Sequence, residues 1–234
     1  MIIEKFQHAV QYLQYLLKAK HRKGYGVHSP FSFHLITSVF EEKFLYYNYS
    51  QIEQLREKLL ADKNIIHVSD YGTGKSGKRS ISSIASRSLK KPKHAQLLFR
   101  LVNAFNPKLI VELGTSLGLT TAYLASVNSN SRVISLEGCN QIASIARSVH
   151  EELGLKNITL LEGNIDDTLP SFLKNETAID FMFFDANHTK EATLRYFHLC
   201  VDKITEKSVF VFDDIHRNNS MQEAWNEIIS HSAI

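Results

Sequence analysis

The chain has 234 residues, of which 44% are hydrophobic and 22% charged, enough for one large domain or for one domain with a helical extension. A net charge of +3 is too small to argue for binding to nucleic acid. Two cysteines, Cys139 and Cys200, exclude a disulfide framework and a cysteine-based zinc site, and they fit a reducing compartment. Polar residues interrupt the apolar positions of residues 1–20, which resemble neither a signal peptide nor a membrane span. We therefore expect a cytoplasmic protein with no membrane or nucleic-acid partner.

The first ninety residues are predicted to form a helical extension. Apolar residues at helical spacing predict four helices, over residues 3–20, 31–40, 51–60 and 81–89. The loop at 24–31 holds His28 between glycines and a proline, where a histidine is more often a structural residue than a ligand contact. We expect residues 1–90 to form a lid over an active site in the remaining chain.

One segment of this extension has the spacing of a phosphate-binding loop. Gly72 to Lys78 reads G-x-x-x-x-G-K, with a short apolar run before it and a helical run after it. The next position should carry a hydroxyl that ligates magnesium, but it is Arg79, and Ser80 comes one place late. A flexible basic surface loop is therefore favoured, and a P-loop phosphotransferase is kept as an alternative function.

Strands and helices alternate from about residue 91 onward. Apolar runs predict five strands, at 108–113, 132–137, 157–162, 178–185 and 207–213. Helical runs are predicted at 96–105, 117–127, 139–153, 166–174, 188–201 and 219–230. Continuous apolar strands separated by helices indicate an α/β fold, with a parallel sheet covered on both faces.

A strand, a glycine turn and a helix start follow one another in LIVELGTSLGLTTAYL. Gly114 and Gly118 flank this turn, which offers backbone N–H groups and room for a ligand to approach closely. Glu137 ends the next strand, where a carboxylate can accept hydrogen bonds from both ribose hydroxyls of NAD or S-adenosylmethionine. Ser116 stands where a dinucleotide loop has glycine, and Glu112 would repel a pyrophosphate but suits a cationic cofactor. The turn therefore favours S-adenosylmethionine over NAD.

A carboxylate stands at the end of every predicted strand or one residue before it. These residues are Glu112, Glu137, Glu162, Asp185 and Asp213, with Asp214 directly after the last. Polar residues are common at strand ends, but a carboxylate at each of them favours a functional explanation. In an open parallel sheet these ends lie at one edge, where ligands bind.

The ordered set of motifs resembles class I S-adenosylmethionine-dependent methyltransferases, in the branch of the catechol and caffeoyl-CoA O-methyltransferases. The resemblance covers about residues 91–216 and runs through KHAQLLFRLV, VELGTSLGLTT, SLEG, LEGNIDDTLP, IDFMFFDANH and VFVFDDIH. It implies a Rossmann-like methyltransferase sheet in a domain spanning 91–234 and methylation of a small-molecule hydroxyl. It also implies that Gly163, Asn164, Ile165 and Asp166 lie beside the adenine, and that Glu137 binds the ribose.

The resemblance further implies a catalytic group at the strand tips. A divalent ion such as Mg²⁺, Ca²⁺ or Mn²⁺ would be held by Asp185, Asp213 and Asp214, the last of which stands where the family has asparagine. Alternatively, Asp185 faces the methionine end of the cofactor while Asp213 and Asp214 cap a helix. The family's catalytic lysine aligns with His188, which is a candidate general base or a helix cap. Asn187 and His216 are secondary candidates for substrate contact.

One departure from the family concerns the C-terminal end of the sheet. The family follows its fifth strand with a helix and an antiparallel pair of strands, whereas here the helix MQEAWNEIIS is followed by HSAI alone. We therefore expect the hairpin to be missing, so that either the chain is truncated or a partner, for example in a homodimer, completes the sheet. An exposed apolar edge strand would be prone to association. A non-catalytic module that binds the cofactor is thus a further alternative.

Overall fold

The computed structural model describes residues 24–69, 71 and 74–234. The helix expected at 3–20 lies outside these residues. The chain forms two compact units, Met1–Leu45 and Tyr46–Ile234. The first contains α2 (Pro30–His34), which begins at Pro30 after the capping residue Ser29, and continues as a π-helix, η2 (Leu35–Phe40). No helix among the described residues is long and apolar enough to cross a membrane.

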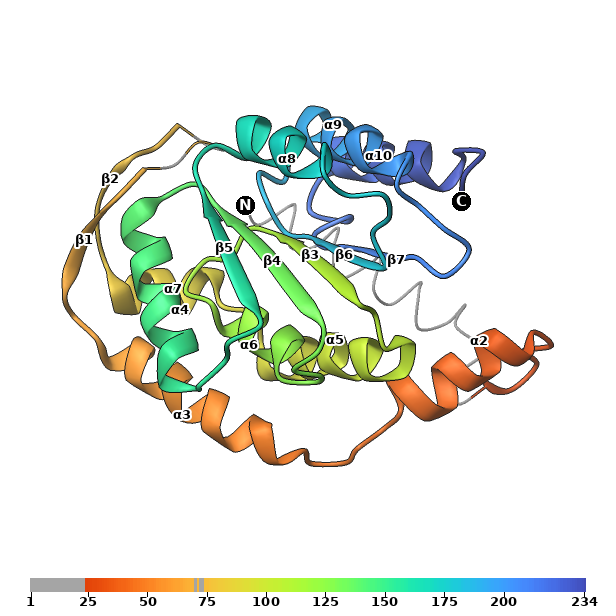
Figure 1. Ribbon diagram of the computed structural model, residues 1–234, viewed down its shortest axis with the longest axis horizontal. Helices are drawn as coiled ribbons and strands as arrows, with labels where there is room; N and C mark the ends of the chain where they lie inside the picture. Colours follow the sequence, from red (N-terminus) through yellow and green to blue (C-terminus); the bar gives the residue numbers. More distant parts are fainter. Residues whose placement is uncertain (1–23, 70, 72–73) are drawn as a thin grey trace. The chain divides into compact units, whose positions relative to one another are not determined.

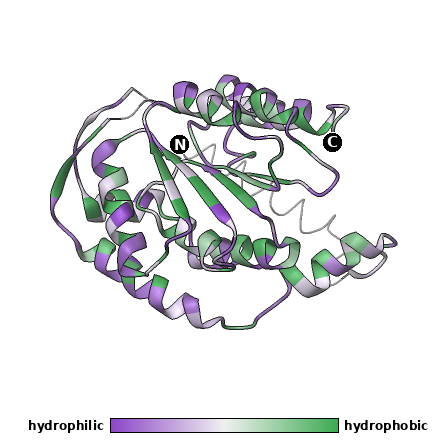
Figure 2. Cartoon of the chain, in the orientation of Figure 1, coloured by the Kyte–Doolittle hydropathy of each residue, from purple (hydrophilic) through white to green (hydrophobic). Residues whose placement is uncertain are grey.

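The second unit is built around a five-stranded parallel sheet in the order β5-β4-β3-β6-β7, which confirms the predicted fold class (Figure 1). The strands are β3 (Leu109–Leu113), β4 (Arg132–Glu137), β5 (Ile158–Glu162), β6 (Phe181–Phe184) and β7 (Val209–Phe212). All five residues of the central strand β3 are buried. Figure 2 shows the hydrophobic character of the strands. This continuous burial explains why the apolar runs were readable in the sequence.

Helices cover both faces of the sheet, with α8, α9 and α10 on one side and α5, α6 and α7 on the other (Figure 1). Their bounds are α5 (Pro92–Phe105), α6 (Leu119–Ala125), α7 (Asn140–Glu152), α8 (Ile165–Leu173), α9 (Lys190–Val201) and α10 (Asn219–Ile229). Alternate residues of β3, namely Leu109, Val111 and Leu113, pack in one core with Leu169 of α8 and Tyr196 of α9. The position between two of them, Glu112, therefore faces the opposite layer.

Residues 46–90 share the hydrophobic core of the α/β part. They contain α3 (Tyr47–Ala61) and α4 (Ile81–Ser88). The Tyr49 ring lies 5.1 Å from that of Phe99 and 5.4 Å from that of Tyr123, and the Tyr123 hydroxyl donates to Glu53 at 2.8 Å. The compact unit thus begins at residue 46, whereas the sequence pattern predicted a boundary near 90.

A two-stranded antiparallel sheet contains the end of the candidate phosphate-binding loop. It pairs β1 (Ile65–Val68) with β2 (Gly77–Ser80). Gly77 and Lys78 therefore lie inside an antiparallel strand, whereas a phosphate-binding loop leads from a strand directly into a helix N-terminus. Gly72 and Thr73 lie outside the described residues. The geometry does not favour the phosphotransferase alternative, and the strand character of 77–80 was not predicted from the sequence.

Candidate cofactor and acceptor site

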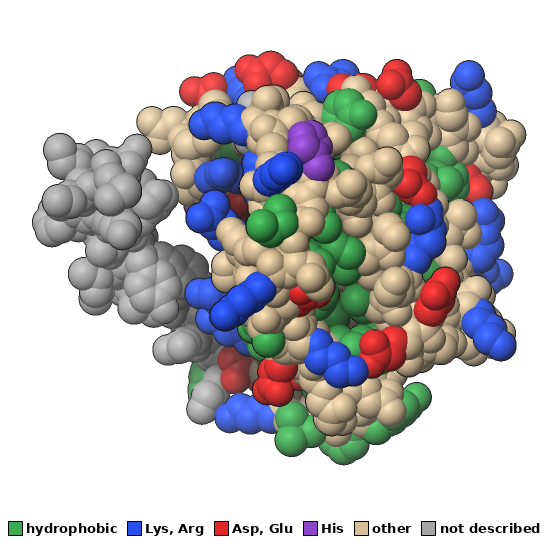
Figure 3. All heavy atoms as spheres, turned by 90° about the vertical axis from the view of Figure 1, so that its left-hand side faces the viewer, with side chains coloured by type: hydrophobic (Ala, Val, Ile, Leu, Met, Phe, Trp, Pro, Cys, Tyr) green, Lys and Arg blue, Asp and Glu red, His purple; other side chains and the backbone are tan. Residues whose placement is uncertain are grey.

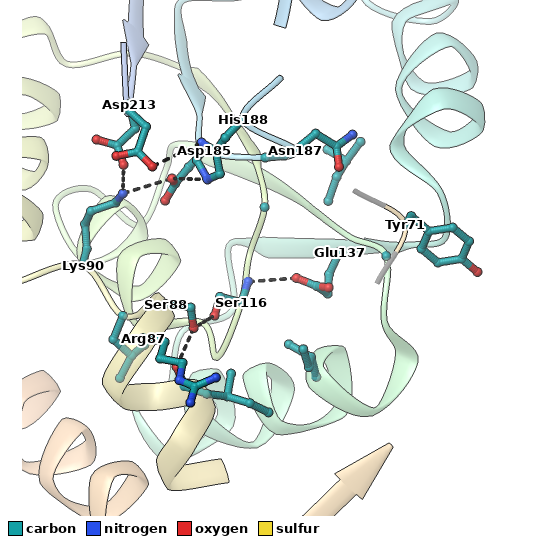
Figure 4. Close-up of a pocket in the computed structure, with 18 of the residues that line it drawn as sticks. Tyr71, Arg87, Ser88, Lys90, Ser116, Glu137, Asp185, Asn187, His188 and Asp213 are labelled. Atoms are coloured by element: carbon teal, nitrogen blue, oxygen red, sulfur yellow. Dashed lines mark hydrogen bonds and ion pairs between the residues drawn. The ribbon is translucent and has the colours of Figure 1, made fainter. Parts of the chain in front are cut away.

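A pocket of about 560 Å³ lies at the carboxyl ends of the parallel strands. Its volume is in the range of small-molecule and cofactor sites. Many of the residues predicted from the sequence line it: Gly114, Ser116, Glu137, Asn164, Ile165, Asp185, Asn187, His188, Asp213 and Asp214. It is also lined by residues from the segment before the sheet, including Tyr71, Arg87, Ser88 and Lys90 (Figure 4).

The glycine turn requires Gly114 for two reasons. Its φ angle is +94°, and a Cβ atom there would lie 2.5 Å from the backbone oxygen of Asp185. The backbone of this turn therefore packs directly against the end of β6. Gly118, with φ +82°, has a similar restriction, because a Cβ atom would lie 2.7 Å from His150 Nε2. Gly118 does not line the pocket, so its contribution is to the shape of the turn.

Glu137 and Ser116 are connected by a hydrogen bond across the pocket floor. The Ser116 backbone N–H donates to Glu137 Oε2 at 2.9 Å (Figure 4). The Cys139 N–H donates to Oε1 of the same carboxylate at 3.0 Å. Ser116 has φ +50° and its Oγ lies 2.8 Å from Ser88 Oγ. The carboxylate at the tip of β4 is thus held in one orientation, as binding of a ribose diol requires.

Glu112 lies behind the turn rather than in the pocket. Its side chain is completely buried, and Oε2 accepts hydrogen bonds from Thr121 at 2.5 Å and Ser135 at 2.6 Å. Burial raises the pKa of Glu112 to about 7. The predicted direct contact with a cationic cofactor does not agree with this position, because strand alternation turns the side chain toward α6. The structure shows it joining β3, β4 and α6 beneath the turn.

The segment after β5 meets the pocket through Asn164 and Ile165. The Asn164 side chain accepts from the Asp166 N–H at 3.1 Å and caps α8. Gly163 has φ +125° and its N–H donates to the Glu137 backbone oxygen at 3.0 Å, but it does not line the pocket. Asp166 forms an ion pair with Arg195 at 2.7 Å. Gly163 and Asp166 therefore shape this segment, while Asn164 and Ile165 present side chains to a ligand.

Lys90 joins the two strand-tip aspartates at the other end of the pocket. Its Nζ lies 3.0 Å from Asp185 Oδ1 and also forms an ion pair with Asp213 Oδ2 (Figure 4). Burial, only partly offset by Lys90, raises the pKa of Asp185 well above its ordinary value. Burial acts in the same direction on Asp213 but is outweighed by its contact with Lys90, so the pKa of Asp213 is lowered. Lys90 was not predicted from the sequence, where its one visible signal is its place just before the helix that leads into the site.

His188 lies between two carboxylates. Its Nε2 is 3.6 Å from Asp185 Oδ1 and its Nδ1 is 3.7 Å from Asp214 Oδ2. Burial lowers the pKa of His188, which keeps the ring neutral near pH 7 and able to accept a proton. His188 does not cap α9, because the capping side chain is that of Thr189. Its φ of +45° places the ring in the pocket as part of the turn after β6.

Other candidates from the strand tips are placed differently. Asn187 lines the pocket, and its amide donates to the hydroxyl of Tyr196 at 2.5 Å. His216 is exposed and its Nδ1 pairs with Gln222 away from the pocket lining. Asp213 and Asp214 do not cap the last helix, since Asn218 does. Both helix-capping alternatives for the strand-tip residues are therefore wrong.

Comparisons with known proteins agree with this geometry. Residues 111–215 match the family described as a methyltransferase domain. No curated protein matches the chain at a significant level.

Solved structures share the fold over most of the chain. An O-methyltransferase from Bacillus cereus in complex with SAH is 20% identical, with a TM-score of 0.61 and 85% of each chain covered. A putative O-methyltransferase from Klebsiella pneumoniae is 16% identical, with a TM-score of 0.60, covering 85% of this chain and 84% of its own. TomG from Streptomyces achromogenes, an O-methyltransferase in complex with SAM, is 19% identical, with a TM-score of 0.54 and coverage of 78% and 76%.

Proposed function

We propose that this chain transfers a methyl group from S-adenosylmethionine to an oxygen atom of a small molecule. The observation that carries the proposal is one continuous pocket, with the Ser116–Glu137 pair at one end and the Asp185–His188 group at the other. The first pair suits a ribose, and Asn164 and Ile165 suit the adenine beside it. The second group then faces the methionine half of the cofactor and the acceptor.

The strand-tip residues supply what methyl transfer needs. The acceptor oxygen must lose a proton and attack the methyl carbon in line with the departing sulfur. A neutral His188 can take that proton, and the nearby Asp214 carboxylate favours the positive charge that the ring then carries. The carboxylate of Asp185 also suits the cationic methionine end of the cofactor. We assign His188 as the general base and Asp185 as the residue that orients it.

A divalent ion at Asp185, Asp213 and Asp214 fits the described residues poorly. Lys90 lies against the first two carboxylates, and Asp214 turns toward Arg217 at 3.4 Å and His188. No group of three or more metal-ligating side chains is found among the described residues. The carboxylates that would bind the ion are thus already paired with positively charged side chains of the chain itself, Lys90 and Arg217.

The charge around the pocket favours an acceptor with a negative group. Arg79, Arg87 and Arg217 line the pocket in addition to Lys90. Figure 3 shows several Lys and Arg side chains gathered along one edge of the face it presents. Guanidinium groups bind carboxylates and phosphates through paired N–H donors. A cytoplasmic location, a homodimer and a role of the N-terminal residues as a lid remain predictions.

Two measurements test the proposal. Calorimetry with S-adenosylmethionine should show binding that Glu137→Ala weakens strongly, and Lys207→Ala, an exposed lysine outside the pocket lining, is a control. Product formation by mass spectrometry with a panel of hydroxylated carboxylates and phosphates then separates an enzyme from a binding module. An intact chain that binds no S-adenosylmethionine would contradict the proposal. Binding without any methylated product across the panel would favour the non-catalytic module.

A further inference from the structure

The Lys90 ammonium occupies the place between the strand tips where the family resemblance puts a metal ion. Neighbouring strands β6 and β7 pair Phe184 with Phe212, so that Asp185 and Asp213 follow side by side. Lys90 reaches both of them from a position 95 residues away in the chain from Asp185 and 123 from Asp213. Its side chain is only 14% exposed. The cation is therefore an integral part of the site and not a surface charge.

The backbone around Lys90 fixes this position. Lys91 is the N-cap of α5, and Pro92 begins the helix. Proline at the first helical position has a fixed φ angle, and the residue before it is extended. The ammonium also lies 5.7 Å from the centre of the Phe183 ring on β6. Lys90 thus lies directly before the N-cap of α5, and its charged end contacts Phe183 of β6 and the aspartates that follow β6 and β7.

One ammonium thus faces both carboxylates at the strand tips. The Lys90 Nζ atom pairs with both Asp185 and Asp213, and these contacts favour the ammonium form of the largely buried side chain. A buried ammonium requires such partners. A divalent ion between the same carboxylates would have to displace Lys90 and leave it without them. An ion pair that is already complete therefore opposes metal binding.

We propose that Lys90 takes over the role of the divalent cation, so that this methyltransferase needs no metal. An ammonium has three N–H donors, and Asp185 and Asp213 accept two of them. The third can donate to the acceptor oxygen in the pocket, which Lys90 lines. This inference rests on the proposed methyl transfer.

The step balances without a metal or any other co-reactant. The acceptor O–H gives its proton to a ring nitrogen of His188, and the oxygen forms a bond to the methyl carbon of the cofactor. The bond from that carbon to sulfur breaks, and its electron pair stays on sulfur. The Lys90 ammonium stabilises the negative charge that develops on the acceptor oxygen before the new bond is complete.

Binding of Mn²⁺ tests this inference independently of turnover. Titrations followed by electron paramagnetic resonance, with S-adenosylhomocysteine present, compare the wild type, Asp213→Asn, Lys90→Met and Lys90→Met/Asp213→Asn. We expect the wild type and Asp213→Asn to bind Mn²⁺ equally weakly. Lys90→Met leaves the carboxylates of Asp185 and Asp213 free of the ammonium, so it should bind Mn²⁺ at least about tenfold more tightly than the wild type. The double variant Lys90→Met/Asp213→Asn should lose this gain. Lys91→Met, which removes a neighbouring charge of the same pocket, should behave as the wild type.

The outcomes separate this inference from the proposed function. Tight Mn²⁺ binding by the wild type that Asp213→Asn abolishes would overturn the role of Lys90, as would a Lys90→Met variant that folds and gains no binding. If Lys90→Met does not fold, the Mn²⁺ affinities of the wild type and Asp213→Asn still test the inference, which predicts that the two are equally weak. Calorimetry with S-adenosylhomocysteine on the same samples reports on the proposed function. A wild type that does not bind S-adenosylhomocysteine would refute methyl transfer. A wild type that binds S-adenosylhomocysteine and also binds Mn²⁺ tightly at Asp213 would refute the Lys90 inference alone.

Discussion

Replacing Gly114 by alanine should destabilise the protein far more than replacing Gly154, although both glycines have positive φ angles. The φ angle is +94° at Gly114 and +66° at Gly154. A Cβ atom at Gly114 would lie 2.5 Å from the Asp185 oxygen and 3.1 Å from its carbonyl carbon, while nothing lies within 4 Å at Gly154. The comparison therefore separates backbone strain, which both variants share, from a collision that only one of them has.

The magnitudes follow from these distances. A left-handed conformation costs a non-glycine residue about 1–2 kcal/mol, which is the expected loss for Gly154→Ala. Gly114→Ala adds the displacement of backbone at the end of β6, for which overpacking costs of about 1–3 kcal/mol are typical. A total of about 2–5 kcal/mol corresponds to a fall in Tm of about 4–20 °C for a unit of this size.

Urea unfolding followed by circular dichroism measures both variants under the same conditions. Calorimetry with S-adenosylmethionine on the folded fraction should show weakened binding for Gly114→Ala alone, because Asp185 moves with the turn. Losses of stability within about 0.5 kcal/mol of each other would show that the turn does not pack against β6 as described, since that difference is near the precision of such comparisons.

Three further predictions concern single side chains. The pKa of buried Glu112 rises from 4.5 to about 7 on folding, so the folded state holds a proton more tightly. Its contribution to stability is complete below pH 4.5 and is lost as the pH rises through 7. Glu112→Gln should flatten this dependence in urea unfolding between pH 4.5 and about 7, and an unchanged slope would contradict it. His188→Gln should retain cofactor binding and form product about 10²-fold or more slowly than the wild type. In the wild type, the rate should fall only below pH 6.5 as the solution is made more acidic, because burial lowers the pKa of His188. Arg87→Ala should raise KM for an anionic acceptor about tenfold and leave calorimetric cofactor binding unchanged; an equal loss of both would place Arg87 at the cofactor instead.

The sheet and one end of the site could be predicted because their signals are local. Each buried strand is a short apolar run, and the residue at its end or directly after it lies at the carboxyl edge of the sheet by topology alone. Glu137, Asp185 and Asp213 were found in this way, and the structure brings them to one pocket. The direction of the Glu112 side chain could also have been predicted from the sequence. Side chains alternate along β3, so Glu112 faces the side of the sheet opposite to the core that contains Val111 and Leu113.

The remaining features depend on contacts between distant parts of the chain. Helical periodicity shows that residues 51–60 have an apolar face, but it does not show that this face packs in one core with Phe99 and Tyr123. Lys90 contacts Asp185 and Asp213, which lie 95 and 123 residues away in the chain. Its place just before a helix does not reveal contacts over such distances in the sequence. The β1–β2 hairpin was missed because the sequence of β2 is polar and resembles a loop.

Binding of S-adenosylmethionine by the wild type and Glu137→Ala tests the central claim most directly. Glu137 is held by the Ser116 and Cys139 N–H groups at the tip of β4, in the orientation that a ribose diol needs. Isothermal calorimetry should show saturable binding by the wild type and a loss of at least about tenfold in the variant, as expected for hydrogen bonds to a charged group. Equal affinities for the two proteins, or no binding by a folded wild type, would contradict the assignment of this pocket to the methyl donor.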